Sequence, residues 1–188
     1  MNAIVPTSLL ASAAQANVLA EPAQYLTFQL AGESYAIGIL AIKEIIEYHS
    51  LTEVPMMPAC VRGVINLRGA VVPVMDLQAR FGRKPSEVTK RTCIVIVEVE
   101  SQNDGERERQ VIGVVVDAVN EVLEISPADI EPAPAFGARI RTDFIQGMGK
   151  VRGKFVILLD VDHVLSLDDL LALSDAGSLA DAHVSAVA

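Results

Sequence analysis

Residues suited to metal binding or catalysis are few in this sequence, and the most suggestive are a D-x-D-H string near its C-terminal end. Asp160, Asp162 and His163 are oxygen and nitrogen donors of the kind that hold cations. Alternation at a strand end would place Asp160 and Asp162 on the same face. No third acidic cluster completes a coordination shell, however, so we expect a solvated strand end with no metal and no cofactor.

Catalytic motifs are equally weak. The stretch GMGKVRGK (147–154) departs from the phosphate-loop spacing G-x-x-x-x-G-K-[ST], and Phe155 stands where a hydroxyl would hold magnesium. No G-x-S-x-G motif, His–Cys pairing or paired carboxylates stand out. The sequence therefore predicts that the protein is not an enzyme. A small barrel enzyme or metal-binding domain is the competing class, and its chemistry would rest on Asp162 or His163.

Composition excludes several further classes. The chain has 188 residues, 51% of them hydrophobic, and a net charge of −9. That much apolar sequence excludes a wholly disordered chain, and the acidic balance disfavours nucleic acid as a partner. Asp or Pro breaks every apolar run before the roughly 18 residues of a membrane-spanning helix, so we expect no direct membrane insertion. Cys60 and Cys93 form no C-x-x-C motif, which fits a reducing cytoplasm.

The elements that must position any site are mostly strands. Residues 25–31 and 35–39 alternate apolar and polar side chains, which predicts a hairpin with one buried face. Residues 91–100 and 109–119 are rich in Val and Ile and predict a second pair of strands, joined by a polar loop. The clearest helix covers residues 166–175, with Ser166 as its N-cap.

An internal repeat suggests how these strands are organised. Residues 63–77 (GVINLRGAVVPVMDL) align without gaps on residues 147–161 (GMGKVRGKFVILLDV), and residues 41–47 align on residues 118–124. A duplicated small all-β unit explains this order, with residues 81–90 as a joint between the halves. Side chains fill the interior of so small a barrel, so function moves to the outer surface or to the seam between barrels.

Charge is distributed unevenly along the chain. Seven Lys and Arg residues fall between Arg62 and Arg91, whereas none follows Lys154. A charge run of this kind is either a solvated face or a surface that orients a partner. Arg68 is the more specific candidate, because an arginine at the tip of a tight turn is well placed to pair with a carboxylate through two hydrogen bonds.

These motifs resemble those of one known family. N-L-R-G at residues 66–69, followed by P-x-x-D-L at residues 73–77, is similar to the CheW family of chemotaxis coupling proteins. The resemblance runs from about residue 24 to residue 175 and leaves residues 1–23 and 176–188 as flexible tails. It implies a mainly all-β fold of two intertwined five-stranded SH3-like β-barrels with a short C-terminal helix.

The resemblance also implies a function. Members of the family are non-catalytic adaptors that couple methyl-accepting chemoreceptors to the histidine kinase CheA. The partners implied are the kinase's regulatory domain and the receptors' cytoplasmic tips, at the inner face of the membrane. An apolar groove between the barrels would take the receptor's helical hairpin tip. The alternative within the family is a coupling protein of a type IV pilus or of another chemosensory array.

The resemblance assigns partner binding to five residues: Arg68, Glu44, Ile42, Gly63 and Val122. Two of them have equally plausible structural roles as plain core, since Ile42 and Val122 are apolar. Gly63 has such an alternative too, because a glycine serves where the backbone needs a positive φ. Arg68 and Glu44 are harder to explain as core, because an unpaired buried charge is costly.

Overall fold

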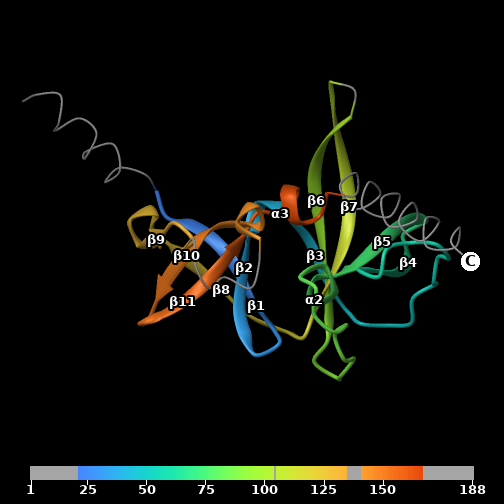
Figure 1. Cartoon of the computed structure of the whole chain (residues 1–188), viewed down its shortest axis with the longest axis horizontal. Coiled ribbons are helices and arrows are strands. Elements are labelled where there is room, and N and C mark those ends of the chain that lie inside the picture. Colours follow the sequence, from blue (N-terminus) through green and yellow to red (C-terminus); the bar gives the residue numbers. More distant parts are fainter. Residues whose placement is uncertain (1–20, 104, 135–140, 167–188) are drawn as a thin grey trace, which may run out of the picture.

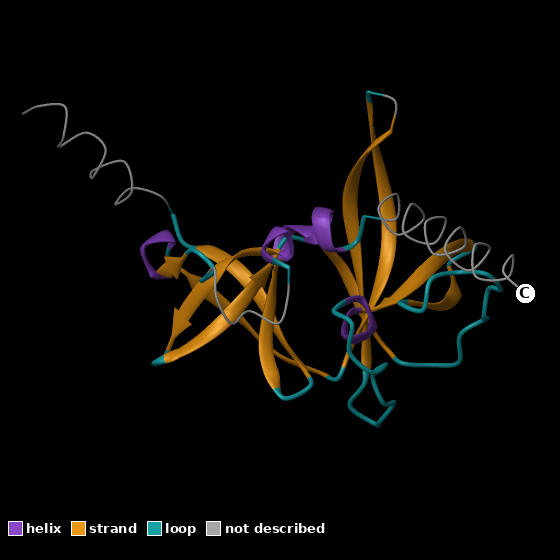
Figure 2. Cartoon of the chain, in the orientation of Figure 1, coloured by secondary structure: helices purple, strands orange, loops and turns teal. Residues whose placement is uncertain are grey.

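Two curled β-sheets lie side by side and form most of the molecule (Figures 1 and 2). The structure is a computed structural model, which describes residues 21–103, 105–134 and 141–166. Within these residues the helices are single turns: η1 (Ile39–Ala41), α2 (Leu77–Arg80), η2 (Pro127–Asp129), η3 (Thr142–Phe144) and α3 (Val161–Val164). The prediction of a mainly β fold is confirmed.

The first barrel is the five-stranded sheet, ordered β3-β6-β7-β5-β4. Its strands are β3 (Ile42–Glu47), β4 (Val61–Leu67), β5 (Ala70–Asp76), β6 (Cys93–Asn103) and β7 (Glu106–Val116). The second barrel is the six-stranded sheet, ordered β8-β1-β2-β11-β10-β9. Its strands are β1 (Ala23–Leu30), β2 (Glu33–Gly38), β8 (Ala118–Ile125), β9 (Ile130–Glu131), β10 (Ile145–Val151) and β11 (Lys154–Leu159).

The barrels are intertwined because the N-terminal hairpin completes the barrel that the C-terminal half builds. Strand β2 pairs in parallel with β11, and in the first barrel β7 pairs in parallel with β5. The chain crosses the seam between the barrels twice, at η1 and at Asp117. Residues 81–90 connect α2 to β6, two elements of the first barrel. The aligned repeats take equivalent places, β3 with β8 and the β4–β5 hairpin with the β10–β11 hairpin.

Three apolar clusters hold this arrangement together. One fills the first barrel and includes Ile94 and Ile96, and one fills the second and includes Ile125 and Leu158. The largest lies between the barrels, where Phe28 packs with residues of the first barrel such as Val97. Residues 93–97 of β6 and 111–116 of β7 have one face inside a barrel and the other against the seam, and these parts of the two strands are continuously apolar.

Some local predictions were wrong. Tyr25 and Thr27 are buried like the residues with which they alternate, because β1 also lies between two cores. The expected polar loop near residues 101–109 is largely strand, since β6 and β7 pair up to Asn103 and Glu106. The predicted helix at 166–175 lies beyond the described residues except for Ser166. Of the predicted tails only residues 21–23 are described, and β1 begins at Ala23.

The D-x-D-H string is also not a strand end. Strand β11 stops at Leu159, and Asp160 is the N-cap of α3, where its carboxylate accepts a hydrogen bond from the His163 backbone N–H. The repeat explains this, because the equivalent Asp76 caps α2 in the same way. Asp160 and Asp162 therefore lack the shared face that a cation site would need.

Candidate functional site

The N-L-R-G segment forms the tight turn between β4 and β5. Arg68 has a φ of 51° and Gly69 a φ of 86°, and two successive positive φ values are the pattern of a two-residue type I′ hairpin turn. The side chain of Asn66 accepts a hydrogen bond from the Gly69 backbone N–H at 2.8 Å. Glycine or asparagine would adopt the Arg68 conformation with less strain, on the order of 1 kcal/mol. An arginine there points to a role for its side chain.

That side chain is held in a bidentate ion pair. The two terminal nitrogens of Arg68 donate to the two carboxylate oxygens of Glu44, both at 2.9 Å. The Arg68 side chain is 78% exposed and that of Glu44 is 24% exposed. The structure therefore brings together two of the predicted site residues and presents them as one rigid unit at the end of the first barrel.

The second barrel repeats this unit. Arg152, the equivalent of Arg68, has the same φ of 51° and pairs with Glu121, the equivalent of Glu44, at 3.4 Å. Each turn is also followed by an exposed apolar residue, Val71 in the first barrel and the equivalent Phe155 in the second. We call these two regions the turn patches, made of Arg68, Glu44 and Val71 in the first barrel and of Arg152, Glu121 and Phe155 in the second.

The two predicted apolar residues lie on β3 and β8, the strands that also carry Glu44 and Glu121. Ile42 opposes Val97 across the β3–β6 pair and packs partly buried against that core. Val122 opposes Leu26 across the β8–β1 pair but remains 47% exposed. Both residues therefore combine a packing role with an accessible surface.

Gly63 has no accessible surface. It is buried, with a φ of 150°, and a Cβ built on it would lie 2.4 Å from the Thr52 carbonyl oxygen. This close approach allows the two hydrogen bonds between Thr52 and Val64, at 2.8 and 3.0 Å, which fasten the loop after β3 onto β4. The contacts of Gly63 are therefore those of a backbone position in which only glycine fits.

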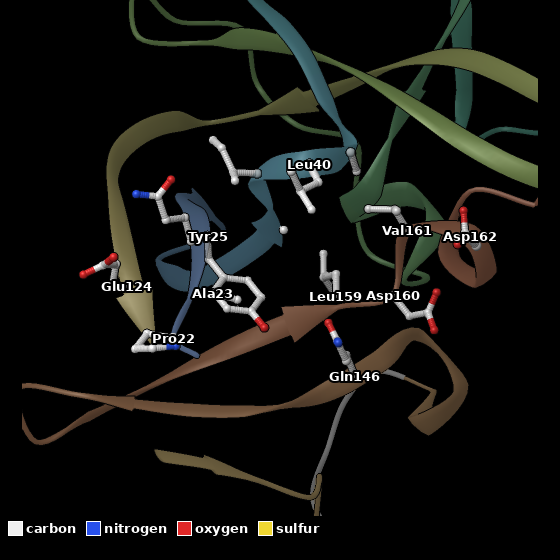
Figure 3. Close-up of a pocket in the computed structure, with 14 residues that line it drawn as sticks. Pro22, Ala23, Tyr25, Leu40, Glu124, Gln146, Leu159, Asp160, Val161 and Asp162 are labelled. Atoms are coloured by element: carbon white, nitrogen blue, oxygen red, sulfur yellow. The ribbon is translucent and has the colours of Figure 1, made fainter. Parts of the chain in front are cut away.

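A groove of about 700 Å³ opens at the seam between the barrels, on the side of η1 (Figure 3). We call it the η1 groove. Leu40, at its rim, is 99% exposed, and the backbone that holds it is continuous with β3. Its lining comes from the second barrel, from η1 and from α3, and combines apolar side chains with a few polar groups; the main ones are Tyr25, Ile39, Leu159, Val161, Gln146 and Glu124.

Leu40 was missed by the sequence analysis. The alternation of Tyr35, Ile37 and Ile39 predicts buried side chains at odd positions, so Leu40 is an apolar residue out of phase with the strand. The available signal was a large apolar residue on the solvent-facing side at the end of a predicted strand. The equivalent position at the second crossing is Asp117, which shows that the fold does not require an apolar residue there.

Burial and ion pairs shift the pKa of a few titratable groups in the part of the chain that the structure describes. Burial, followed by the hydrogen bond to Glu33, raises the pKa of Tyr35 well above its usual value, and burial also raises the pKa of the Cys60 thiol. A hydrogen bond from Lys43 lowers the pKa of Glu98, whose side chain is partly exposed. Within the described residues, no group of three or more His, Cys, Asp or Glu side chains is placed to hold a metal ion. None of the helices in that part of the chain is long and apolar enough to cross a membrane.

Comparisons with known proteins give a consistent result. A family model described as "CheW-like domain" matches residues 24–169. "Chemotaxis protein CheW" of Klebsiella aerogenes is 34% identical over 143 residues, covering 76% of this chain and 81% of that protein. The protein of the same name from Rhizobium meliloti is 35% identical, covering 75% and 86%. The crystal structure of the scaffolding protein TtCheW from Thermoanaerobacter tengcongensis superposes with a TM-score of 0.67 at 35% identity, covering 77% of this chain and 88% of that one.

Proposed function

The chain belongs to the CheW family of chemotaxis coupling proteins, and from that premise we propose how its surfaces join a chemoreceptor to a kinase. The family consists of scaffolds, and we infer that this member acts by binding alone. We place it in the cytoplasm, held at the inner face of the membrane by receptor arrays. Its folded domain covers residues 24–175, with tails on either side.

The η1 groove is the proposed site for the helical tip of a methyl-accepting chemoreceptor. An amphipathic helix binds by laying an apolar face into a groove, and this groove has apolar side chains from the second barrel, η1 and α3. The full exposure of Leu40 is the observation that carries the assignment, because burying a leucine side chain is worth about 1.5–3 kcal/mol. Ile42 extends the same surface from η1 onto β3.

The turn patches are the proposed sites for the regulatory domain of the kinase CheA. Each patch combines a rigidly held arginine with an apolar residue that is at least half exposed, 73% for Val71 and 52% for Phe155. A guanidinium fixed by a carboxylate loses little freedom on binding, which reduces the entropic cost of the contact. Val122, on the strand that also carries Glu121, would extend the second patch.

We assign the five predicted residues accordingly. Arg68 and Glu44 contact the kinase directly, Ile42 extends the receptor surface, Val122 extends the second turn patch, and Gly63 maintains the backbone that positions β4. Because each barrel has its own turn patch with a paired arginine and glutamate, the adaptor would have two surfaces for the kinase and one groove for the receptor.

The test is reconstitution with a receptor cytoplasmic fragment and a CheA-type kinase, using Leu40→Asp as the principal variant. This change installs the residue found at the equivalent position of the second crossing, so the fold should tolerate it. We expect receptor-fragment affinity to fall about 10- to 100-fold, from the loss of one buried leucine. Binding to the kinase regulatory domain should be unchanged.

Val71→Asp is the matched control, because it also replaces an exposed apolar residue with an aspartate. We expect it to weaken kinase binding while leaving receptor binding intact. If Leu40→Asp binds the receptor fragment as the wild type does, the η1 groove is not the receptor site. If receptor-dependent kinase activation does not require the chain at all, the proposed coupling role is wrong.

A further inference from the structure

The duplication that creates the η1 groove also creates a second groove, at the other crossing of the seam. Its lining includes Asp117 and Gln78, the equivalents of Leu40 and Asp162 in the η1 groove. The second groove measures about 780 Å³, close to the size of the first. In Figure 1 the two crossings lie at opposite edges of the seam, one beside α3 and one in the yellow segment between β7 and β8. We call this second hollow the Asp117 groove.

The two grooves differ in chemistry. At the position equivalent to Leu40, the Asp117 groove has the carboxylate of Asp117. This carboxylate accepts hydrogen bonds from the Ala31 backbone N–H at 2.8 Å and from the Gln78 amide at 3.1 Å. The loop between α2 and β6 lines the groove with three exposed cations, Lys84, Lys90 and Arg91, and with one exposed carboxylate, Glu87, so the cations of this loop outnumber its acids. None of the three makes an ion pair with any residue that the structure describes, whereas most arginines there do.

The loop that carries these cations is anchored. Ser86 is buried, and its backbone N–H and hydroxyl both donate to Asp76, which is itself fully buried. The side chain of Arg62 donates to the Ser86 carbonyl oxygen. At the far end of the loop, the buried Thr92 accepts a hydrogen bond from the Thr89 backbone N–H. The cations are therefore presented from a fixed backbone, which lowers the entropic cost of binding.

We propose that the Asp117 groove binds a short acidic peptide segment of a partner protein. Clustered cations without internal partners, beside a groove of ligand-binding size, complement carboxylates. The net charge of −9 disfavours a long polyanion such as nucleic acid, because the rest of the surface repels it. A few carboxylates confined to the groove meet the cations and avoid that repulsion. The site is separate from the η1 groove and does not depend on the receptor assignment.

A titration with two labelled peptides tests the proposal, one of alternating Glu and Gly and one of alternating Gln and Gly. We expect the Glu peptide to bind the full chain at low ionic strength and the Gln peptide not to bind. The double variant Lys90→Gln/Arg91→Gln should weaken binding of the Glu peptide about tenfold or more. The matched control Lys150→Gln/Lys154→Gln removes two exposed cations from the β10–β11 hairpin and should bind as the wild type does.

Two results would overturn the proposal. Equal weakening by both double variants would show that the peptide responds to overall charge. An oligonucleotide of equal charge that binds as tightly as the Glu peptide would show a general anion patch. Leu40→Asp separates this proposal from the receptor assignment, because it should leave Glu-peptide binding unchanged even where receptor binding is lost.

Discussion

Replacing Gly63 with alanine distinguishes a backbone role for this glycine from a direct contact with a partner. The change has two costs. A residue with a side chain at a positive φ is strained by about 1–2 kcal/mol, and the φ here is 150°. The new Cβ would also lie 2.4 Å from the carbonyl oxygen of Thr52, a backbone atom that has to move, and overpacking of this kind costs about 1–3 kcal/mol.

We therefore expect Gly63→Ala to lower the free energy of unfolding by about 3 kcal/mol, which is about 6–12 °C in Tm for a domain of this size. Gly69→Ala is the matched control, because Gly69 also has a positive φ but nothing lies within 4 Å of its added Cβ. It should cost only the strain. Thermal and urea unfolding measure both, and receptor and kinase binding are titrated well below the lower Tm.

The outcome decides between the two roles. If Gly63 acts through the backbone, the main effect of Gly63→Ala is a loss of stability. The affinity of the folded variant for its partners then falls only where the displaced loop after β3 disturbs neighbouring residues. A variant with wild-type Tm and lost binding would refute this reasoning and place Gly63 at the interface. Equal destabilisation by both variants would show that the approach of Thr52 does not matter.

Two further predictions concern Arg68 and Tyr35. Arg68→Glu should leave Tm nearly unchanged, because an exposed ion pair contributes only about 0.2–1 kcal/mol. It should nevertheless weaken binding to the kinase regulatory domain by more than about 1 kcal/mol, and unchanged affinity in that titration would contradict the assignment. Tyr35 has a raised pKa in the fold, so its stabilising effect is complete below the usual tyrosine value of about 10 and declines as pH rises above it. Urea unfolding at pH 9 and pH 11 should show a smaller alkaline loss for Tyr35→Phe, and an equal loss would disprove it.

The sequence predicted most of the architecture because the duplication left its markers in the chain. Both N-L-R-G-type turns appear as aligned Arg-Gly pairs, and the aspartates that follow them cap equivalent helical turns. The prediction for Asp160 failed even though this alignment was available. Strand alternation suggested that the strand now seen as β11 continues through Asp160. Whether Asp160 caps a helix depends on where that strand ends, and alternation does not specify the end of a strand.

The candidate site was only partly predictable, for a different physical reason. Arg68 and Glu44 were both named, but their pairing was not, because β3 and β4 are the first and last strands of the first barrel and meet only when the sheet curls. Likewise, burial on both faces of β1 arises from contact between two barrels, and no periodicity within one strand encodes that contact. Leu40 did break the pattern in the sequence, but a single apolar residue out of phase predicts little without the groove beside it.

The duplication also accounts for how a symmetric scaffold can perform an asymmetric task. Two copies of one barrel provide two turn patches of the same design, which suits partner domains that are themselves alike. If the two repeats were identical, the duplication would also provide two identical grooves, and a receptor helix could then bind on either side of the molecule. Leu40 at one crossing and Asp117 at the other remove that ambiguity. A negative charge at the equivalent position makes the second groove a poor site for an apolar helix face, because the carboxylate would lose its hydration or its hydrogen bonds on burial. In the proposed arrangement, one substitution between the repeats is thus enough to give the adaptor a single orientation relative to the receptor while keeping both ends available to the kinase.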